Sequence, residues 1–235
     1  GVSLPSVISY PNDVNREVAI WISPEGKAGL YDTSGDLRLG VKSLIEAGTA
    51  VIGADLLYQG EFLADGKPLE HAPMVGEANK GRDAYSGYTY GYNLPLVSQR
   101  ANDVLTLLAF AKNHDEAPEA VHLVGLDGAG HWVALAAAVA GDAVASTAID
   151  TAGFRFADVP HLDDIDFLPG GAKYGDLPGL MALIAPNPVW LAGEDKATPA
   201  IVEAAYQAAG AEDALTQFEG DSDAQEQAAI EWLTR

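Results

Sequence analysis

Residues 121–130 read Val-His-Leu-Val-Gly-Leu-Asp-Gly-Ala-Gly and predict a buried strand that turns sharply into an alanine-rich helix. Asp127 stands at the tip of this turn, with small residues on either side. Small flanking residues let the backbone fold tightly enough to raise one side chain above a sheet, which is the arrangement of a nucleophile elbow. A serine usually occupies the tip, so this stretch predicts the architecture more clearly than the chemistry.

Apolar runs rich in β-branched residues alternate with helical stretches along the rest of the chain. The expected strands are 6–10, 17–22, 50–56, 121–125, 145–149, 188–192 and 214–218. Helices are expected after Pro95, from a cap at Thr198 to Gly210, and over 224–233. Helical crossovers join parallel strands, so we predict one α/β domain over 1–235, with a mainly parallel, twisted sheet, helices on both faces and a site at the carboxyl ends of the strands.

Two long insertions interrupt this pattern, at about residues 58–93 and 153–180. Both follow strands at the edge where a site is expected, and long loops in such places commonly form lids or binding surfaces. The first insertion contains four tyrosines whose amphipathic rings are suited to stacking on sugars or other flat molecules, namely Tyr85, Tyr88, Tyr90 and Tyr92. The simpler interpretation is that these rings pin the loop to the domain.

The composition excludes several partners and chemistries. The chain has 34 Asp plus Glu against 13 Lys plus Arg, and a formal charge of −21 repels the phosphates of nucleic acids. It has no cysteine, which excludes disulfides, thiol catalysis and thiolate zinc sites. No stretch of about 18 apolar residues predicts a membrane span. We therefore expect a soluble, acidic protein of bacterial type that binds neither nucleic acid nor membrane.

Two further segments resemble parts of a known superfamily. Tyr92-Asn-Leu-Pro95 leads into a helix that carries Arg100 and Asp103. Pro188-Val-Trp-Leu-Ala-Gly-Glu-Asp195 is similar to a strand and turn that deliver the acid of a catalytic triad. With the elbow, and in this order, the segments resemble the α/β-hydrolase superfamily, in particular its acetyl xylan esterase and dienelactone hydrolase-like branch. The resemblance covers nearly the whole chain and implies the α/β-hydrolase fold and carboxylic-ester hydrolase chemistry.

The resemblance assigns roles by position. Asp127 takes the place of the nucleophile, and the backbone amide of Gly128 is offered to an oxyanion hole. Gly26 or Lys27 takes the place of the second amide donor. Asp195 takes the place of the triad acid.

The histidine of the triad is missing. In the family it follows the last strand, whereas this chain has no histidine after His161. Loss of a triad histidine lowers turnover by about a million-fold, so we expect a degenerate triad. His71, His131 and His161 are the histidines that could fold toward Asp127, whereas His122 alternates within an apolar strand and is expected to be a core residue.

Asp127 has more than one interpretation. An ionised aspartate attacks without a base, as in the haloalkane dehalogenases and epoxide hydrolases of the superfamily, but the alkyl ester it forms needs an activated water for its cleavage. Alternatively, Asp127 caps the following helix by accepting its amides. A metal site formed with Asp150 and Asp195 has no supporting loop motif, so we expect no metal and no cofactor.

The sequence leaves two hypotheses about function. In the favoured one, the chain is a pseudoenzyme that binds a small molecule, a carbohydrate or a companion catalytic domain. In the alternative, it is an active esterase, or a dehalogenase-like or epoxide-hydrolase-like enzyme, with Asp127 as nucleophile and a non-standard base.

Two other hypotheses concern the fold and the extent of the chain. Gly125, Gly128 and Gly130 loosely match a dinucleotide-binding turn, with Asp150 in the place that contacts a ribose. One short run precedes the strand at 17–22, so we expect the first strands of the hydrolase sheet to be lacking or the chain to belong to a longer protein. The compartment stays open, with a secreted or periplasmic setting as the hypothesis.

Overall fold

The apolar runs of the sequence form one sheet in the computed structural model, which describes residues 3–75, 86–115, 117–194 and 197–235. Its seven strands are β1 Ser6–Ser9, β2 Glu17–Ile22, β3 Ala50–Ala54, β4 Ala120–Gly125, β5 Ser146–Asp150, β6 Val189–Ala192 and β7 Leu215–Gln217. They lie in the order β1-β3-β2-β4-β5-β6-β7. The edge strand β1 is antiparallel to β3, and the other neighbours pair in parallel, which confirms the mainly parallel sheet.

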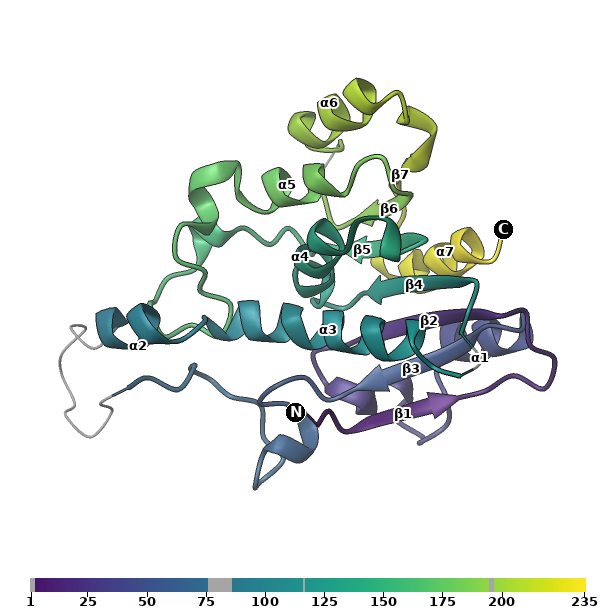
Figure 1. Ribbon diagram of the computed structural model, residues 1–235, viewed down its shortest axis with the longest axis horizontal. Helices are drawn as coiled ribbons and strands as arrows, with labels where there is room; N and C mark the ends of the chain where they lie inside the picture. The colour runs from purple at the N-terminus through teal and green to yellow at the C-terminus, as the bar shows by residue number, and fades with distance from the viewer. Residues whose placement is uncertain (1–2, 76–85, 116, 195–196) are drawn as a thin grey trace.

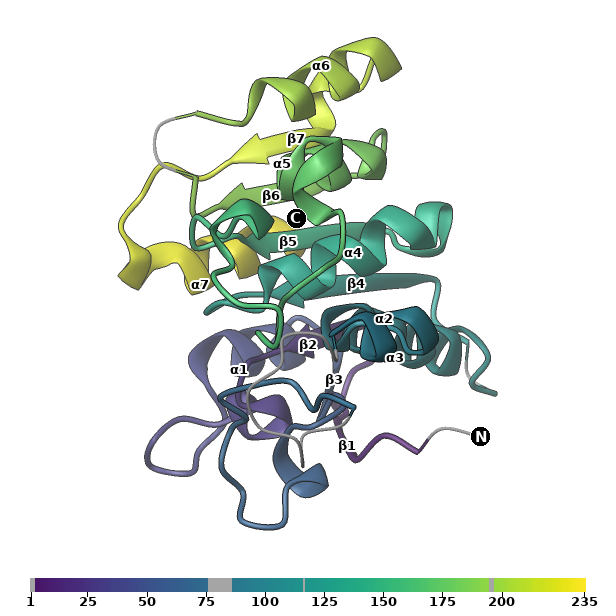
Figure 2. The ribbon, with the colours of Figure 1, turned by 90° about the vertical axis from the view of Figure 1, so that its left-hand side faces the viewer.

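Helices cover both faces of this sheet, as expected (Figures 1 and 2). They are α1 Leu39–Glu46, α2 Ser86–Tyr92, α3 Leu96–Lys112, α4 Gly130–Ala140, α5 Asp176–Met181, α6 Ala200–Ala209 and α7 Ser222–Leu233. The helices α3 to α6 pack on one face in sequence, while α1 and α7 contact each other on the opposite face. Within the described ranges, none of the helices combines the length and the apolar character needed to cross a bilayer.

The core consists of two apolar layers, one on each face of the sheet. In β2, Ile20 and Ile22 join the layer beneath α3 and α4, whereas Ala19 and Trp21 join the layer beneath α1 and α7. A strand that is buried on both faces needs apolar residues at successive positions. This requirement explains why the central strands appear in the sequence as continuous apolar runs.

The glycines of the elbow permit a close crossing of β4, α4 and β5. A Cβ atom on Gly130 would lie 2.0 Å from the carbonyl oxygen of Asp150, and one on Gly125 would lie 2.7 Å from Val133 Cγ2. Both positions therefore require glycine for packing alone. The strand order also differs from the 3-2-1-4-5-6 order of dinucleotide-binding sheets, so the dinucleotide-binding hypothesis is wrong.

The ends of α6 differ in how well the sequence predicted them. Gly210 ends the helix in the left-handed conformation, with φ +64°, as expected. The N-terminal cap is Pro199, without a side-chain cap bond, and not Thr198. The hydroxyl of Thr198 instead donates to Gln217 Oε1 at 2.6 Å, because β7 lies beside this end of the helix.

The two long insertions meet beside the carboxyl edge of the sheet (Figure 1). The amide of Ala72 in the first insertion donates to the carbonyl oxygen of Asp163 in the second at 2.6 Å. His71 and Asp163 also lie within ion-pair distance, with Nδ1 and Oδ2 3.4 Å apart. The insertions therefore form one surface, although about 95 residues separate their starts in the sequence.

We predict that Gly130→Ala lowers the free energy of unfolding by about 3 kcal/mol, because the added methyl group collides with rigid backbone at Asp150. Urea unfolding followed by circular dichroism measures this change. Gly87→Ala in α2 is the matched control, since a Cβ there meets nothing within 4 Å and alanine favours a helix. Equal stability of the Gly130→Ala variant and the wild type would contradict the close crossing.

Candidate functional site

The turn after β4 places Asp127 in a strained and accessible position. Its φ is +55°, in the left-handed region that residues other than glycine rarely adopt. The side chain is 54% exposed at the carboxyl edge of the sheet. Such strain costs about 1–3 kcal/mol and is common at functional sites. The tip of the elbow thus has the backbone geometry that the sequence predicts.

The carboxylate of Asp127 binds an arginine, Arg38, which is the N-cap residue of α1. Arg38 Nη1 donates to Asp127 Oδ2 at 2.6 Å, and Arg38 Nη2 lies 2.6 Å from Glu226 Oε2. Glu226 Oε1 in turn accepts the amide of Gly40 at 2.7 Å. Burial disfavours the charge on Arg38, but the bonds to Asp127 and the charge of Glu226 raise its pKa overall. A chain of opposite charges therefore links the elbow to α1 and α7.

No histidine of the described chain has a hydrogen bond or ion pair with Asp127. His131 Nε2 lies 2.9 Å from Asp166 Oδ1, and His122 Nδ1 lies 2.7 Å from Ser146 Oγ. His71 pairs with Asp163, as described above. Burial lowers the pKa of His122, which favours the neutral ring of a core residue, as expected from its strand position.

The helix-capping interpretation of Asp127 is wrong. The N-cap of α4 is Ala129, and no side chain makes a cap hydrogen bond there. The carboxylate points instead to Arg38, because a guanidinium offers a charged donor where the helix amides offer neutral ones.

The segment expected to supply a second oxyanion donor lies next to the elbow. A Cβ on Gly128 would be 3.8 Å from Pro24 Cγ. The amide of Gly26 donates to the carbonyl oxygen of Ser23 at 3.0 Å, and the amide of Lys27 donates to Asp55 Oδ1 at 3.0 Å. Both amides thus have acceptors within the protein and are not free for an oxyanion.

Asp55 organises this turn and was not found from the sequence. It is buried at the end of β3 and accepts the amides of Lys27 and Glu61 as well as Lys27 Nζ, which lies 2.7 Å from Oδ2. Burial alone would raise the pKa of Asp55, but these bonds lower it overall. The same ammonium group of Lys27 also contacts the Glu61 carboxylate.

The position of the triad acid can be described only in part. Asp195 lies outside the described residues, and the side chain of its neighbour Glu194, which follows β6, is 5% exposed. Glu194 accepts Thr151 Oγ1 at 2.8 Å and Arg155 Nη1 at 3.2 Å, with a second contact to Arg155 Nη2. The bond to Glu194 raises the pKa of Arg155. Glu194 is thus paired with an arginine of the second insertion.

A second carboxyl group, Asp150, is buried beside the elbow. Its Oδ1 accepts the amide of Ala152 at 3.0 Å, and a Cβ on Gly193 would lie 2.4 Å from the same oxygen. Burial raises the pKa of Asp150, and the nearby charge of Asp127 adds to this effect. The sequence singled out Asp150 as an alternative metal or ribose ligand. No group of three or more His, Asp or Glu side chains in the described ranges could hold a metal ion.

The predicted tyrosines have different environments. Tyr85 lies outside the described residues, and the remaining three belong to α2. Tyr90 contacts the Leu162 carbonyl oxygen through its hydroxyl and Phe167 through its ring, with centroids 5.2 Å apart. Tyr90 therefore pins the two insertions together. Tyr88 and Tyr92 are 60% and 85% exposed.

A buried polar cluster fastens the second insertion to α3 and α4. Asp166 Oδ1 accepts Trp132 Nε1 at 2.7 Å and lies 2.9 Å from His131 Nε2. The guanidinium of Arg100 lies 4.6 Å from the centroid of the Trp132 ring, and Phe154 stacks on His131 at 4.3 Å. Burial raises the pKa of Asp166, but the bond to His131 and the other contacts lower it overall. No sequence pattern indicated this aspartate.

Comparisons with known proteins support the fold. No family model matches the chain, and no curated protein sequence matches it. Among solved structures, a Bacteroides fragilis protein assigned as an acetyl xylan esterase is 16% identical, with a TM-score of 0.63 over 92% of this chain. The present chain spans 62% of the length of that protein.

Two other structures give the same result. A promiscuous esterase of carbohydrate esterase family 15 from a marine bacterial metagenome has a TM-score of 0.61 at 15% identity, covering 97% of this chain and 76% of the esterase. A Klebsiella pneumoniae protein assigned as a dienelactone hydrolase has a TM-score of 0.54 at 13% identity, covering 99% and 92%. This chain therefore has the α/β-hydrolase fold, and its structural neighbours are carboxylic ester hydrolases.

We predict that Asp166→Asn lowers the free energy of unfolding by about 2 kcal/mol at neutral pH, because an amide replaces the charged acceptor of the buried cluster. The folded-state pKa of Asp166 lies below its ordinary value of 3.8. Its stabilising contribution is therefore complete above that value and is lost as the pH falls through the folded-state pKa.

Urea titrations of wild type and variant from about pH 7 to about pH 3 test this dependence. The difference between the two proteins should narrow toward the acidic end. Asp142→Asn, at an exposed position, is the control and should leave stability nearly unchanged. A difference that grows as the pH falls would show that Asp166 does not stabilise the fold as a carboxylate.

Proposed function

We propose that this chain is a binding domain built on the α/β-hydrolase fold, with a catalytic triad that is degenerate. The observation that carries the proposal is the bond between Asp127 and Arg38, since the residue in the nucleophile position is paired with a guanidinium and not with an imidazole. A triad requires a base that takes and returns a proton. Arginine stays protonated and does not perform this role.

Three features disfavour the hydrolysis of a carboxylic ester by Asp127. A carboxylate that attacks a carboxylic ester forms a mixed anhydride of higher energy than the substrate. The charge-assisted bond from Arg38 stabilises the Asp127 carboxylate in its resting state. The amides of Gly26 and Lys27, which would stabilise an oxyanion, donate to Ser23 and Asp55.

A carbohydrate is the ligand class that the surface beside the elbow suits best. Tyr88 and Tyr92 are one helical turn apart in α2, so their exposed rings lie on the same side of the helix. Tyr90 anchors that helix to the second insertion, which gives the rings a fixed support. The structural neighbours that act on carbohydrate esters, such as the acetyl xylan esterase, are consistent with this class of ligand.

One observation favours a second candidate, an active hydrolase with Asp127 as nucleophile. Asp127 has a φ of +55° and a half-exposed side chain, which are features of a catalytic nucleophile elbow. Backbone strain of this kind is common at functional sites. In this alternative, Asp127 forms an alkyl ester and a non-standard base activates water. The candidate for this base is Asp150, because it lies close enough for the charge of Asp127 to raise its pKa.

We predict that hydrolysis of p-nitrophenyl acetate by the wild type is close to the buffer rate and that Asp127→Ala leaves it unchanged. The physical reason is that no proton shuttle contacts Asp127 in the described chain. Asp142→Ala is the control for the loss of one exposed carboxylate.

A fall of about a hundredfold on Asp127→Ala, with Asp142→Ala unaffected, would overturn the proposal and support catalysis. Haloalkane and epoxide substrates are assayed with the same variants. A covalent adduct on Asp127, detected by mass spectrometry, would establish the alkyl-ester alternative.

We predict that Tyr92→Ala weakens binding of xylo-oligosaccharides by about tenfold, because the variant loses one stacking face. Isothermal titration calorimetry measures the dissociation constants. Tyr174→Ala is the matched control, since Tyr174 is also strongly exposed but lies in the second insertion. Absence of binding by the wild type, or equal losses in both variants, would contradict the carbohydrate site.

A further inference from the structure

A hollow lies at the end of the sheet opposite the elbow. It has a volume of about 390 Å³ and lies where β2 and β3 begin, beside the last turn of α3. Asp127 follows the carboxyl end of β4, which is parallel to β2 and six residues long. A strand of this length spans about 20 Å, so the hollow is separate from the site described above.

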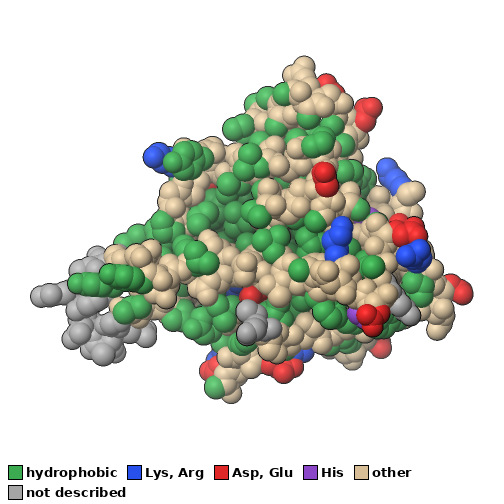
Figure 3. Space-filling model, in the orientation of Figure 1, with side chains coloured by type: hydrophobic (Ala, Val, Ile, Leu, Met, Phe, Trp, Pro, Cys, Tyr) green, Lys and Arg blue, Asp and Glu red, His purple; other side chains and the backbone are tan. Residues whose placement is uncertain are grey.

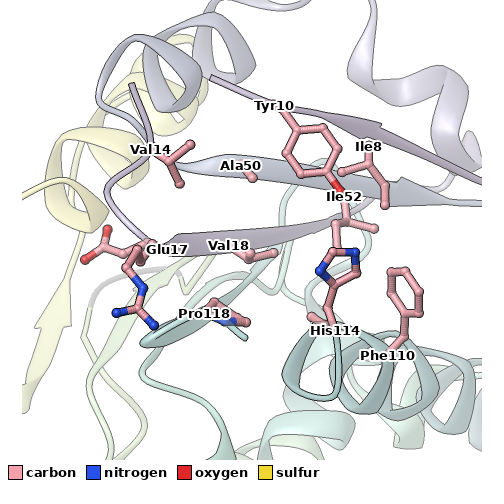
Figure 4. Close-up of a pocket in the computed structure, with 12 residues that line it drawn as sticks. Ile8, Tyr10, Val14, Glu17, Val18, Ala50, Ile52, Phe110, His114 and Pro118 are labelled. Carbon is pink, nitrogen blue, oxygen red and sulfur yellow. The ribbon is translucent and has the colours of Figure 1, made fainter. Parts of the chain in front are cut away.

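The walls of the cavity come from the sheet and from one helix end (Figure 4). Ile8, Val18 and Ile52 contribute aliphatic side chains from the three strands β1, β2 and β3. Phe110 and His114 stand on the opposite side, with ring centroids 6.0 Å apart and planes at 72°. The contact between these two rings holds the aromatic wall in place. The cavity is thus an apolar slot between a rigid sheet and a fixed aromatic edge.

The charge around the cavity argues against an anionic occupant. Arg16, the guanidinium among the lining residues, is already paired with Glu119 at 2.6 Å. Glu17 adds a carboxylate at the same end, and the chain carries a net charge of −21. Hydrophobic side chains gather over α3, α4 and α5, while charged groups lie mainly toward the edges of the molecule (Figure 3). An anion would therefore be repelled without gaining a free cationic partner.

The size of the cavity argues for one small molecule. Ligand sites commonly measure about 300–1,000 Å³ and are lined mainly by apolar and aromatic side chains with few polar groups. This cavity falls at the low end of that range. The hydroxyl of Tyr10 is a polar group at its lining that can orient a ligand without requiring a charge.

We propose that this cavity binds one neutral, largely apolar small molecule, with an aliphatic chain or one to two aromatic rings and at most one weakly polar group. Burial of the ligand between Val18 and Phe110 supplies the affinity through the hydrophobic effect. This site is independent of the carbohydrate surface and of any chemistry at Asp127. Binding in this cavity would therefore be a second binding function of the same domain.

Fluorescence titration of the intact chain tests the proposal with two probes of similar shape. N-phenyl-1-naphthylamine is neutral, whereas 8-anilinonaphthalene-1-sulfonate carries an added sulfonate. The neutral probe should bind saturably with one site per chain and about tenfold more tightly than the anionic probe. Tighter binding of the anionic probe, or no saturable binding of the neutral one, would overturn the proposal.

Two variants locate the binding. Ala111→Leu places extra carbon atoms from α3 inside the cavity. It should weaken the binding of the neutral probe by about tenfold or more. Ala109→Leu adds the same group to the exposed side of the same helix and should leave binding unchanged. Val14→Trp, at an exposed lining position, narrows the cavity without disturbing the core and should also weaken binding.

Circular dichroism confirms that each variant is folded, and sedimentation velocity measures the oligomeric state. We expect the sedimentation coefficient of the chain to be the same with and without the probe. Unchanged affinity in both Ala111→Leu and Val14→Trp would overturn it. Self-association that is lost in Val14→Trp would show that a second copy of the chain, and not a small molecule, occupies the cavity.

Discussion

The close crossing of α4 over the end of β5 is the constraint on which the site depends. Gly130 allows this approach, because any side chain there would overlap the backbone of Asp150. The chain enters the helix through a turn in which Asp127 has φ +55°, and the turn lifts its carboxylate above the sheet. The same crossing brings the buried carboxyl of Asp150 close enough for the charge of Asp127 to raise its pKa.

Charge pairing determines what this edge of the sheet can do. Arg38 holds Asp127, Lys27 holds Asp55, and Arg155 holds Glu194. These three cations are drawn from 13 Lys plus Arg in a chain with 34 Asp plus Glu. Arg38 also contacts Glu226 and Lys27 also contacts Glu61, so three cations meet five carboxylates at this edge and a net negative charge remains. Arginine and lysine stay protonated at neutral pH, so these partners do not act as bases for the carboxylates.

The fold and the function of this chain are separate questions. Its solved neighbours are ester hydrolases, yet identities of 13–16% support a shared fold alone. Function resides in particular side chains placed on a fold, and those side chains can change while the core persists. Here an apolar layer packs on each face of the sheet, while the amide of Gly26 donates to Ser23 and the amide of Lys27 donates to Asp55.

The sequence by itself determined the strands, the elbow and the existence of α3, α4, α6 and α7, because apolar periodicity and small residues act over a few neighbouring positions. It did not predict α1, α2 and α5. It misjudged the partner of Asp127 and missed Asp55 and Asp166 as organising groups. Arg38 and Asp127 are 89 positions apart, and Glu194 lies 39 positions from Arg155. Charged side chains look alike in a sequence whether they are solvated or paired. Only the tertiary structure, by bringing distant turns to one edge, decided which charges meet.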